Sequence, residues 1–516
     1  MDWSVSRSRW RKRTQRSKPL FLLSLAFLFL FLFLFLLLLL SLSTSSSLFR
    51  SLLPFASSPL STTQSLTSQS AQCGGRAPDL AGQRFLWYAP HSGFSNQVGE
   101  LKNAIVIAAI LNRTLIVPPV LDHHAVALGS CPKFRVSSPT EIRVAVWDHV
   151  MELVRDRRYV SMADIVDLSS IAPTMVKTID FRVFASMWCG IDIKEACFAG
   201  LCCAVSGLGS SSGNFEQCRS LISGLQGSID HCIYAVEEDC RTAVWTYQQN
   251  NDGVLDSFQP DKELQRKKKI SYIRKRKDVY NALGPGSKAE TATILAFGTL
   301  FSSPYRGSQL YIDIHEPLKD FRIQSSLKEI EFLPFVPEIV DAGKEFAVSR
   351  IKEPFLCAQL RLLDGQFKNH WKTTFSALQQ KLKSIELEIK ANQVTHPISI
   401  FIMTDLPRAN WTRTYLEEIA KSNMYKLYTL QENDELVLQA ARSLMAAEHG
   451  LRSGYLPRID HANDGQHSCH GGSLPDILLY VEESVCSCAS LGFVGTAGST
   501  IAESIGVMRR NNVCKL

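Results

Sequence analysis

Arginine, asparagine and hydroxyl side chains follow three separate apolar stretches of the sequence. Arg361 ends the run 355–361, Asn96 follows the run 85–89, and Ser499 and Thr500 follow the run 491–494. An arginine at the end of a strand can hold an anionic group with two hydrogen bonds. A glycine-containing loop that leads into a helix N-terminus offers free N–H groups, which suits a phosphate or pyrophosphate. The pattern therefore indicates an anion site.

Each of these signals also has a plainer explanation. An asparagine that opens a helix is often a helix cap, and Asn96 fits that role as well as it fits ligand binding. The small-residue loop 495–498 is explained equally by capping of the helix that follows, in which Thr500 and Glu503 have the spacing of a capping box. Strand-end arginines such as Arg361 also form ordinary surface ion pairs, here with Asp364.

The elements that must position these residues are alternating strands and helices. An apolar run at 85–89, a helical pattern at 98–111 and a second apolar run at 114–117 form a strand–helix–strand unit. The buried strands expected at 355–361 and 398–403 predict a second unit of the same kind. Such units build parallel sheets, whose ligands bind at the carboxyl ends of the strands. The predicted class is therefore α/β.

Composition and charge exclude two broad classes. The chain has 516 residues, of which 45% are apolar and 20% charged, so a mainly disordered protein is excluded. The net charge is +7, but seven Lys and Arg residues and Asp2 give +6 within the first eighteen positions, leaving +1 for the rest. We therefore expect no nucleic acid partner, because such partners need a basic excess on the folded surface.

The N-terminal region has the pattern of a membrane anchor. Residues 20–40 are Leu, Phe and Ala apart from Ser24, which is long enough to cross the roughly 30 Å hydrocarbon core as a helix. The basic tail 1–19 places the N-terminus in the cytoplasm, so the remaining chain is expected in a lumen. The alternative is a cleaved signal peptide, which has a shorter apolar region. The Ser/Thr-rich residues 41–72 are predicted to form a flexible stem.

Cysteine usage agrees with a luminal location. Seven of the 14 cysteines lie between Cys189 and Cys240, and without a Cys-x-x-Cys pair they indicate disulfides rather than a metal site. The cluster His467, Cys469 and His470 is read in the same way. No Asp-x-Asp triplet occurs, so a metal that bridges a diphosphate is not expected. Asn112 and Asn410 begin N-glycosylation sequons.

At this point the sequence resembles a known family. The stretches 93–97 and 111–119, then 296–318, then Gln359-Leu360-Arg361, and finally 493–500 are similar in content and order to the motifs of the protein O-fucosyltransferases, especially their plant branch. The resemblance implies two Rossmann-like domains facing a cleft, the GT-B arrangement. We place them at 73–345, with a Cys-rich insertion at about 189–240, and at 346–516. A single transmembrane helix precedes them.

The resemblance also implies a function. It predicts an inverting transfer of fucose from GDP-fucose to a Ser/Thr hydroxyl of a protein or to a glycan, without a required cofactor, by a single-pass type II protein of the Golgi or endoplasmic reticulum membrane. The implied donor-binding residues are Gly93, Phe94, Asn96, Gln359, Arg361, Asp364, Glu483, Ser499 and Thr500. Arg361 and Asn96 are the implied catalytic residues. Arg361 would neutralise the departing β-phosphate, with Asp364 orienting it, and Asn96 would lie near the reacting sugar carbon.

The sequence departs from the family pattern at one residue. The family's His-x-Arg is here Gln359-Leu360-Arg361, and glutamine cannot carry a charge or shuttle a proton. The alternative function is therefore a non-catalytic luminal scaffold that binds a GDP-sugar or a glycan. For the acidic residue that the family uses near the guanine, Glu482 and Glu483 are the candidates. Candidates for a catalytic base are Glu100, Asp122 and Asp405.

Overall fold

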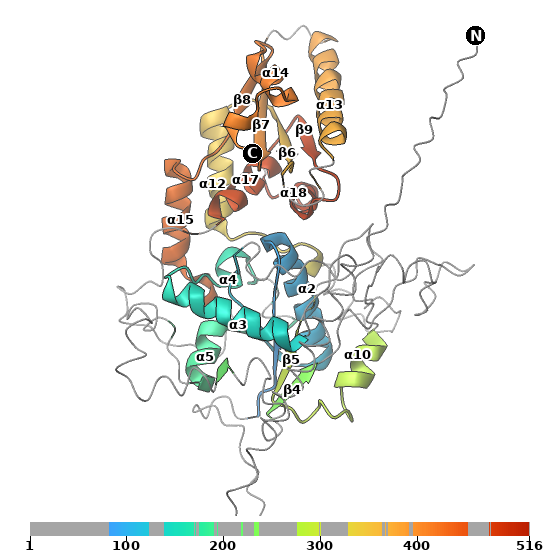
Figure 1. Cartoon of the computed structure of the whole chain (residues 1–516), viewed down its shortest axis with the longest axis vertical. Coiled ribbons are helices and arrows are strands. Elements are labelled where there is room, and N and C mark those ends of the chain that lie inside the picture. The colour runs from blue at the N-terminus through green and yellow to red at the C-terminus, as the bar shows by residue number, and fades with distance from the viewer. Residues whose placement is uncertain are drawn as a thin grey trace, which may run out of the picture. The chain divides into compact units, whose positions relative to one another are not determined.

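Two parallel β-sheets carry the fold of the computed structural model (Figure 1). The structure describes residues 82–122, 139–169, 171, 175–189, 193, 218–219, 232–236, 276–298, 300, 329–363, 367, 370–391, 396–452, 474 and 476–514. The predicted tail, membrane span and stem lie outside these residues, as do Asp364, the cluster at 467–470 and most of the Cys-rich insertion. Within the described residues, no helix has the length and apolar character needed to span a membrane.

The first sheet has the strand order β3-β2-β1-β5-β4, with every neighbouring pair parallel. Its strands are β1 (Phe85–Tyr88), β2 (Thr114–Val117), β3 (Thr178–Asp180), β4 (Ile233–Val236) and β5 (Ile294–Phe297). Its helices are α2 (Phe94–Leu111), α3 (Pro139–Arg155), α4 (Met162–Ile165), α5 (Phe181–Cys189) and α10 (Arg276–Leu283). The order reverses between β1 and β5, and doubly wound sheets bind their ligands at such a switch point.

Both faces of this sheet are buried, as expected for a parallel sheet. Leu86 and Tyr88 pack on the side of α2, with Leu101 and Ile105. The alternate residues of the same strand, such as Phe85 and Trp87, pack on the other side with residues of α3 and α5. Arg113, 3% exposed, caps the N-terminal edge by donating to the carbonyl oxygens of Ala292 (2.8 Å) and Ala289 (2.9 Å). The short apolar strands therefore form the centre of a three-layer unit.

The second sheet has the order β8-β7-β6-β9, again parallel throughout. Its strands are β6 (Phe355–Leu360), β7 (Ile398–Thr404), β8 (Tyr425–Tyr428) and β9 (Gly492–Gly495). Its helices are α12 (Pro337–Glu345), α13 (Trp371–Ala391), α14 (Tyr415–Lys421), α15 (Glu435–Ala447), α16 (His449–Arg452), α17 (Ile477–Ser487) and α18 (Thr500–Arg510). Here the switch point lies between β6 and β9, with α13 covering one face.

The elements expected from the sequence are present, with shifted ends. The strand expected at 355–361 is β6 and that at 398–403 is β7, which confirms the α/β class. The helix expected from residue 98 begins four positions earlier, at Phe94, because this ring packs on Tyr480 of α17 at 4.3 Å between centroids. The predicted domain boundary at 345/346 falls where α12 continues into a π-helix (Phe346–Ile351), and the boundaries remain predictions.

Disulfides were expected, and three lie among the described residues. Cys189 is bonded to Cys218 inside the Cys-rich region. Cys357 of β6 is bonded to Cys486 of α17, and Cys488 to Cys514. The Cys357–Cys486 bond holds α17 against β6, a central strand of the second sheet. It therefore fixes a helix that lines the site described next.

Candidate functional site

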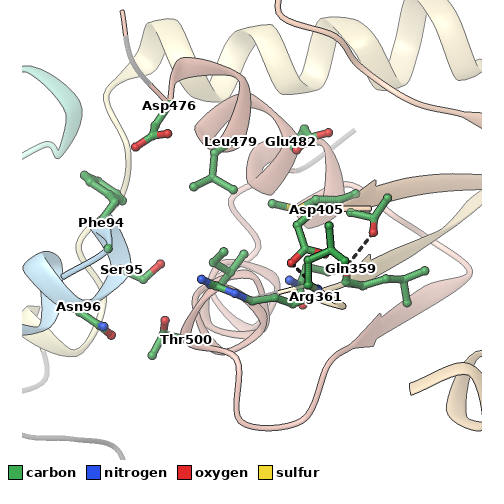
Figure 2. A pocket seen from close by; sticks show the side chains of 16 residues that line it. Phe94, Ser95, Asn96, Gln359, Arg361, Asp405, Asp476, Leu479, Glu482 and Thr500 are labelled. Atoms are coloured by element: carbon green, nitrogen blue, oxygen red, sulfur yellow. Dashed lines mark hydrogen bonds between the residues drawn. The ribbon is translucent and has the colours of Figure 1, made fainter. Parts of the chain in front are cut away.

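A cavity of about 460 Å³ lies where the predicted motif residues converge (Figure 2). Its lining residues are Gly93, Phe94, Ser95, Asn96, Gln359, Leu360, Arg361, Leu363, Met403, Thr404, Asp405, Asp476, Leu479, Glu482, Thr500 and Ile501. Segments about 400 residues apart in the sequence therefore share one pocket. Its size is within the usual range for small-molecule sites.

The topology of the sheets explains why these residues meet. Gln359 and Arg361 lie at the carboxyl end of β6, and Thr500 lies just past β9, the neighbour of β6 across the switch point. Residues 93–96 follow β1, which lies at the switch point of the first sheet. Ligands of doubly wound sheets bind at such positions. Residues that the resemblance assigned to one donor site therefore line one cavity, and their role in donor binding remains a prediction.

Three helix N-termini contribute residues to the cavity. They belong to α2 through residues 93–96, α17 through Asp476 and Leu479, and α18 through Thr500 and Ile501. The first turns of a helix have unpaired N–H groups and carry the positive end of the helix dipole. Arg361 and the N-terminus of α18 line part of the cavity with a cation and N–H donors, which suits an anionic ligand. We call this part the positive wall.

Asn96 is not the cap of its helix. The N-cap of α2 is Gly93, which has no side chain, and Asn96 stands three residues further on. The backbone N–H of Asn96 donates to the carbonyl of Gly93 (2.9 Å), while its side chain lines the cavity. Of the two interpretations left open by the sequence, the structure therefore excludes capping for Asn96.

The end of β6 is fastened to the loop after β9. The backbone N–H of Arg361 donates to Oγ1 of Thr496 (2.9 Å), and the N–H of Thr496 donates to the backbone carbonyl of Gln359 (3.0 Å) and to its Oε1 (3.3 Å). The Arg361 guanidinium lies over the ring of Phe367, 5.4 Å from its centroid. These contacts fix the direction in which Arg361 leaves the strand.

Gln359 is 3% exposed, yet it lines the cavity. Its Oε1 accepts the N–H of Thr496, so its amide N–H groups are not used in that bond. A glutamine in this position donates hydrogen bonds to a bound group without adding charge. Arg361 is therefore the cationic side chain of the cavity lining.

Three carboxyl groups line the cavity, and they differ in environment. Asp405 accepts the backbone N–H groups of Leu362 (2.7 Å) and Leu363 (3.0 Å), so it holds the chain that follows β6. Burial and the neighbouring Glu483 raise the pKa of Glu482 well above its ordinary value. The pKa of Asp476 is also raised, chiefly by burial and then by Asp122 and Glu432.

Two predicted donor-binding residues lie outside the cavity lining. Ser499 is the N-cap of α18 and accepts the N–H of Ala502 (3.5 Å), which also corrects the expectation that Thr500 and Glu503 form the cap. Glu483 is fully buried on the inner side of α17. Successive helix residues point about 100° apart, so Glu482 faces the cavity instead.

Asp476, which lines the cavity, and Thr496, which supports Arg361 from outside it, carry no clear functional signal in the sequence. Asp476 precedes α17 in a stretch that reads as a loop, and Thr496 was seen only as part of a small-residue loop. The dipeptide Pro475-Asp476 directly precedes an apolar run, and from this pattern a helix start could have been predicted here. Among the described residues, no group of three His, Cys, Asp or Glu side chains is arranged to hold a metal ion.

Comparison with known proteins identifies a close relative. The chain is 55% identical over 443 residues to "O-fucosyltransferase 30" of Arabidopsis thaliana, which covers 84% of each chain. No protein-family profile matches. Among solved structures, POFUT1 in complex with GDP has 12% identity and a TM-score of 0.37, covering 83% of this chain and 96% of that one. POFUT1 in complex with GDP-fucose has 12% identity and a TM-score of 0.34, covering 83% and 94%.

Proposed function

The chain belongs to the O-fucosyltransferase family, and from this premise we propose that it transfers fucose from GDP-fucose to an acceptor hydroxyl with inversion at the sugar carbon. The observation that carries the proposal is the convergence of Asn96, Arg361 and Thr500 in one cavity. These residues come from three of the motifs by which the sequence resembles the family. Convergence of the motifs at the switch points of two parallel sheets is the arrangement that a nucleotide-sugar site requires.

The diphosphate of the donor fits the positive wall of the cavity. When the bond between the sugar carbon and the phosphate oxygen breaks, the electron pair goes to GDP and negative charge develops on the β-phosphate. Arg361 and the N-terminal N–H groups of α18 stabilise that charge, and Thr500 adds a hydroxyl. Because these groups are fixed before the reaction, as the Thr496 hydrogen bond to Arg361 illustrates, they need little reorganisation.

The remaining pocket residues fit the rest of the donor. Asn96 lies beside the N-terminus of α2, where its amide can bond the sugar near the reacting carbon. Glu482 takes the position proposed for an acidic group near the guanine, because it is the member of the pair Glu482 and Glu483 that faces the cavity. We propose no metal ion in this reaction, since Arg361 and the helix N-termini supply the positive potential.

The acceptor and the location are proposed on the sequence. The acceptor is a Ser/Thr hydroxyl of a protein or a hydroxyl of a glycan. The apolar residues 20–40 and the basic tail before them support a type II anchor in the Golgi or endoplasmic reticulum membrane, with the two sheets on the luminal side. The disulfides Cys357–Cys486 and Cys488–Cys514 agree with an oxidising compartment.

Calorimetric titration of the full chain with GDP-fucose, GDP-mannose and UDP-sugars tests the donor. We expect selective binding of GDP-fucose, and Arg361→Ala should weaken it at least tenfold. Arg408→Ala is the matched control, because Arg408 also lies over an aromatic ring, that of Trp411, but does not line the cavity. A folded protein that binds none of these nucleotide sugars would contradict the proposal.

A further inference from the structure

The reaction proposed above needs a group that removes the proton of the acceptor hydroxyl, and three carboxylates that the sequence offers for this are already engaged. Glu100 is fully buried and accepts the backbone N–H groups of His91 (3.1 Å) and Leu300 (3.2 Å). Asp122 is paired with Arg158 (2.6 Å) and is not part of the cavity lining. Each therefore has a structural partner, and neither lines the cavity.

Asp405 does line the cavity, but it has a structural task there. Both of its oxygens accept backbone N–H groups, those of Leu362 and Leu363, and so hold the turn after β6. Both carboxylate oxygens of Asp405 are thereby committed to holding the backbone. Among the described residues, the carboxyl groups of the cavity lining that remain are Glu482 and Asp476.

Asp476 occupies a helix N-cap without acting as a cap. An aspartate at this position ordinarily accepts an N–H of the first turn, but here the side chain forms no such bond. The reason is the backbone, which has φ 61° and ψ 5°, a left-handed conformation instead of the extended one that a capping residue needs. Backbone strain of this kind is concentrated at functional sites. The carboxyl group is thereby left free of the helix end and lines the cavity.

The position of Asp476 separates it from Glu482. In the view of Figure 2, Asp476 lies on the left, above Phe94, Ser95 and Asn96, whereas Glu482 lies on the right, toward Asp405. Asn96 is the residue that the proposed function places near the reacting carbon. Asp476 is therefore on the same side of the cavity as Asn96, and Glu482 is on the side of Asp405.

The electrostatic surroundings of Asp476 also suit a base. Burial, Asp122 and Glu432 raise the pKa of Asp476, and Asp476 in turn raises that of the Tyr480 hydroxyl, one turn further along α17. A general base works best when its pKa approaches the working pH, because it then takes up a proton readily yet is still partly ionised. Burial and Glu483 raise the pKa of Glu482 as well, so the positions of the two carboxyl groups distinguish them.

We propose that Asp476 is the general base of fucosyl transfer, an inference that rests on the function proposed above. Its carboxylate takes the proton of the acceptor hydroxyl as the bond between that oxygen and the sugar carbon forms. The bond from the same carbon to the β-phosphate oxygen breaks, and its electron pair leaves with GDP. The products are the fucosylated acceptor, GDP and a protonated Asp476, which then returns the proton to solvent.

The test compares water, which must lose a proton when it attacks the sugar carbon, with azide, which has no proton to lose. The full chain is incubated with GDP-fucose in water alone or with sodium azide, and GDP release is measured together with GDP-fucose affinity. Asp476→Asn keeps the size of the side chain, and asparagine tolerates the left-handed backbone. Asp434→Asn is the matched control, because Asp434 is also an N-cap aspartate without a cap bond but lies outside the cavity.

If Asp476 is the base, Asp476→Asn binds GDP-fucose within about twofold of the wild type and releases GDP to water roughly 10²–10⁴-fold more slowly. Azide then restores release at least tenfold and yields fucosyl azide, since azide needs no deprotonation. Unchanged release to water in Asp476→Asn, binding without release in the wild type, or a loss that azide does not relieve would each overturn the assignment. A wild-type chain that does not bind GDP-fucose would instead refute the proposed function.

Discussion

The backbone N–H of Arg361 donates to Oγ1 of Thr496 over 2.9 Å, which ties the cationic residue of the site to the loop after β9. Thr496 is 1% exposed, so the bond is shielded from water. The side chain of Thr496 thus joins the two strands that flank the switch point of the second sheet. This bond makes the position of Arg361 depend on a residue that does not line the cavity.

Thr496→Val removes this bond and keeps the shape of the side chain. We expect the free energy of unfolding to fall by about 1–2 kcal/mol, because a buried N–H loses its acceptor. The affinity for GDP-fucose should fall about three- to tenfold, about 0.7–1.4 kcal/mol, because the strand end that carries Arg361 is loosened. Denaturant unfolding and calorimetry measure the two effects.

The control for Thr496→Val is Thr414→Val. Thr414 caps α14 by accepting the N–H of Leu416 (3.2 Å) and does not line the cavity. Its loss should lower stability by about 1 kcal/mol without changing donor affinity. Equal effects of both variants on GDP-fucose binding would show that Thr496 acts only through stability.

Gln359 offers a test of charge in the site. Gln359→Glu places a second acidic group beside Arg361 and the bound diphosphate, so we expect GDP-fucose affinity at pH 7 to fall at least tenfold, about 1.4 kcal/mol. Gln359→His keeps a hydrogen-bonding side chain and should bind within about threefold of the wild type. Calorimetry and turnover are measured for both variants. A tenfold gain in turnover by Gln359→His without a gain in affinity would instead indicate that the native site is degenerate.

Sequence reasoning recovered the elements with strong hydrophobic patterns and missed features set by distant contacts. The runs that became β1, β6 and β9 were evident because buried strands are continuous apolar stretches. The start of α2 was missed because it depends on Phe94 packing against Tyr480, 386 positions away. No local pattern reports such a contact.

Sequence patterns also could not decide which of two adjacent acidic residues lines the cavity. Glu482 and Glu483 are identical in type, and the rotation of α17 about its axis decides which of them reaches the cavity. That rotation is set by packing of Val481 and Val485 in the core and by the bond from Cys486 to Cys357. Asp476 was missed for a related reason, because its left-handed backbone has no signature in the residue type.

Glu483 predicts a pH dependence of stability. Burial raises its pKa from 4.5 to about 8, with a smaller opposing effect of the Ser504 hydroxyl. Between these two pH values the folded chain keeps a proton that the unfolded chain has released. Because unfolding then releases a proton, rising pH from 4.5 to about 8 lowers stability. This loss is absent below pH 4.5, where both states are protonated.

Glu483→Gln should therefore stabilise the chain above pH 4.5, on the order of 2–3 kcal/mol at pH 7.5, and leave it nearly unchanged at pH 4. Denaturant unfolding across this range measures the effect. In this variant the stability should still fall with rising pH, but less steeply, because the pKa of Glu482 is raised as well. Glu435→Gln, at an exposed position, is the control and should change neither value. A Glu483→Gln variant that is less stable than the wild type at pH 7.5 would contradict a protonated Glu483.

The last prediction concerns a buried ion cluster that receives the short helix α16. Arg182 pairs with Asp180 (2.8 Å) and Asp164 (3.0 Å), all nearly inaccessible to solvent, and the N–H of Gly450 donates to Asp164 (2.8 Å). A Cβ at position 450 would lie 2.7 Å from Nη2 of Arg182 and would also overlap Asp180. A glycine is therefore required where α16 meets the first sheet.

Gly450→Ala must separate these charges from one another or move α16 away. Either result leaves a buried charge with poorer partners, so we expect a loss of about 3–5 kcal/mol in the free energy of unfolding. Gly99→Ala is the matched control, since a Cβ there meets nothing within 4 Å and the residue lies inside α2. That control should gain about 0.5–1 kcal/mol from helix propensity alone. Similar stability of the two variants would show that α16 can move off the cluster without cost.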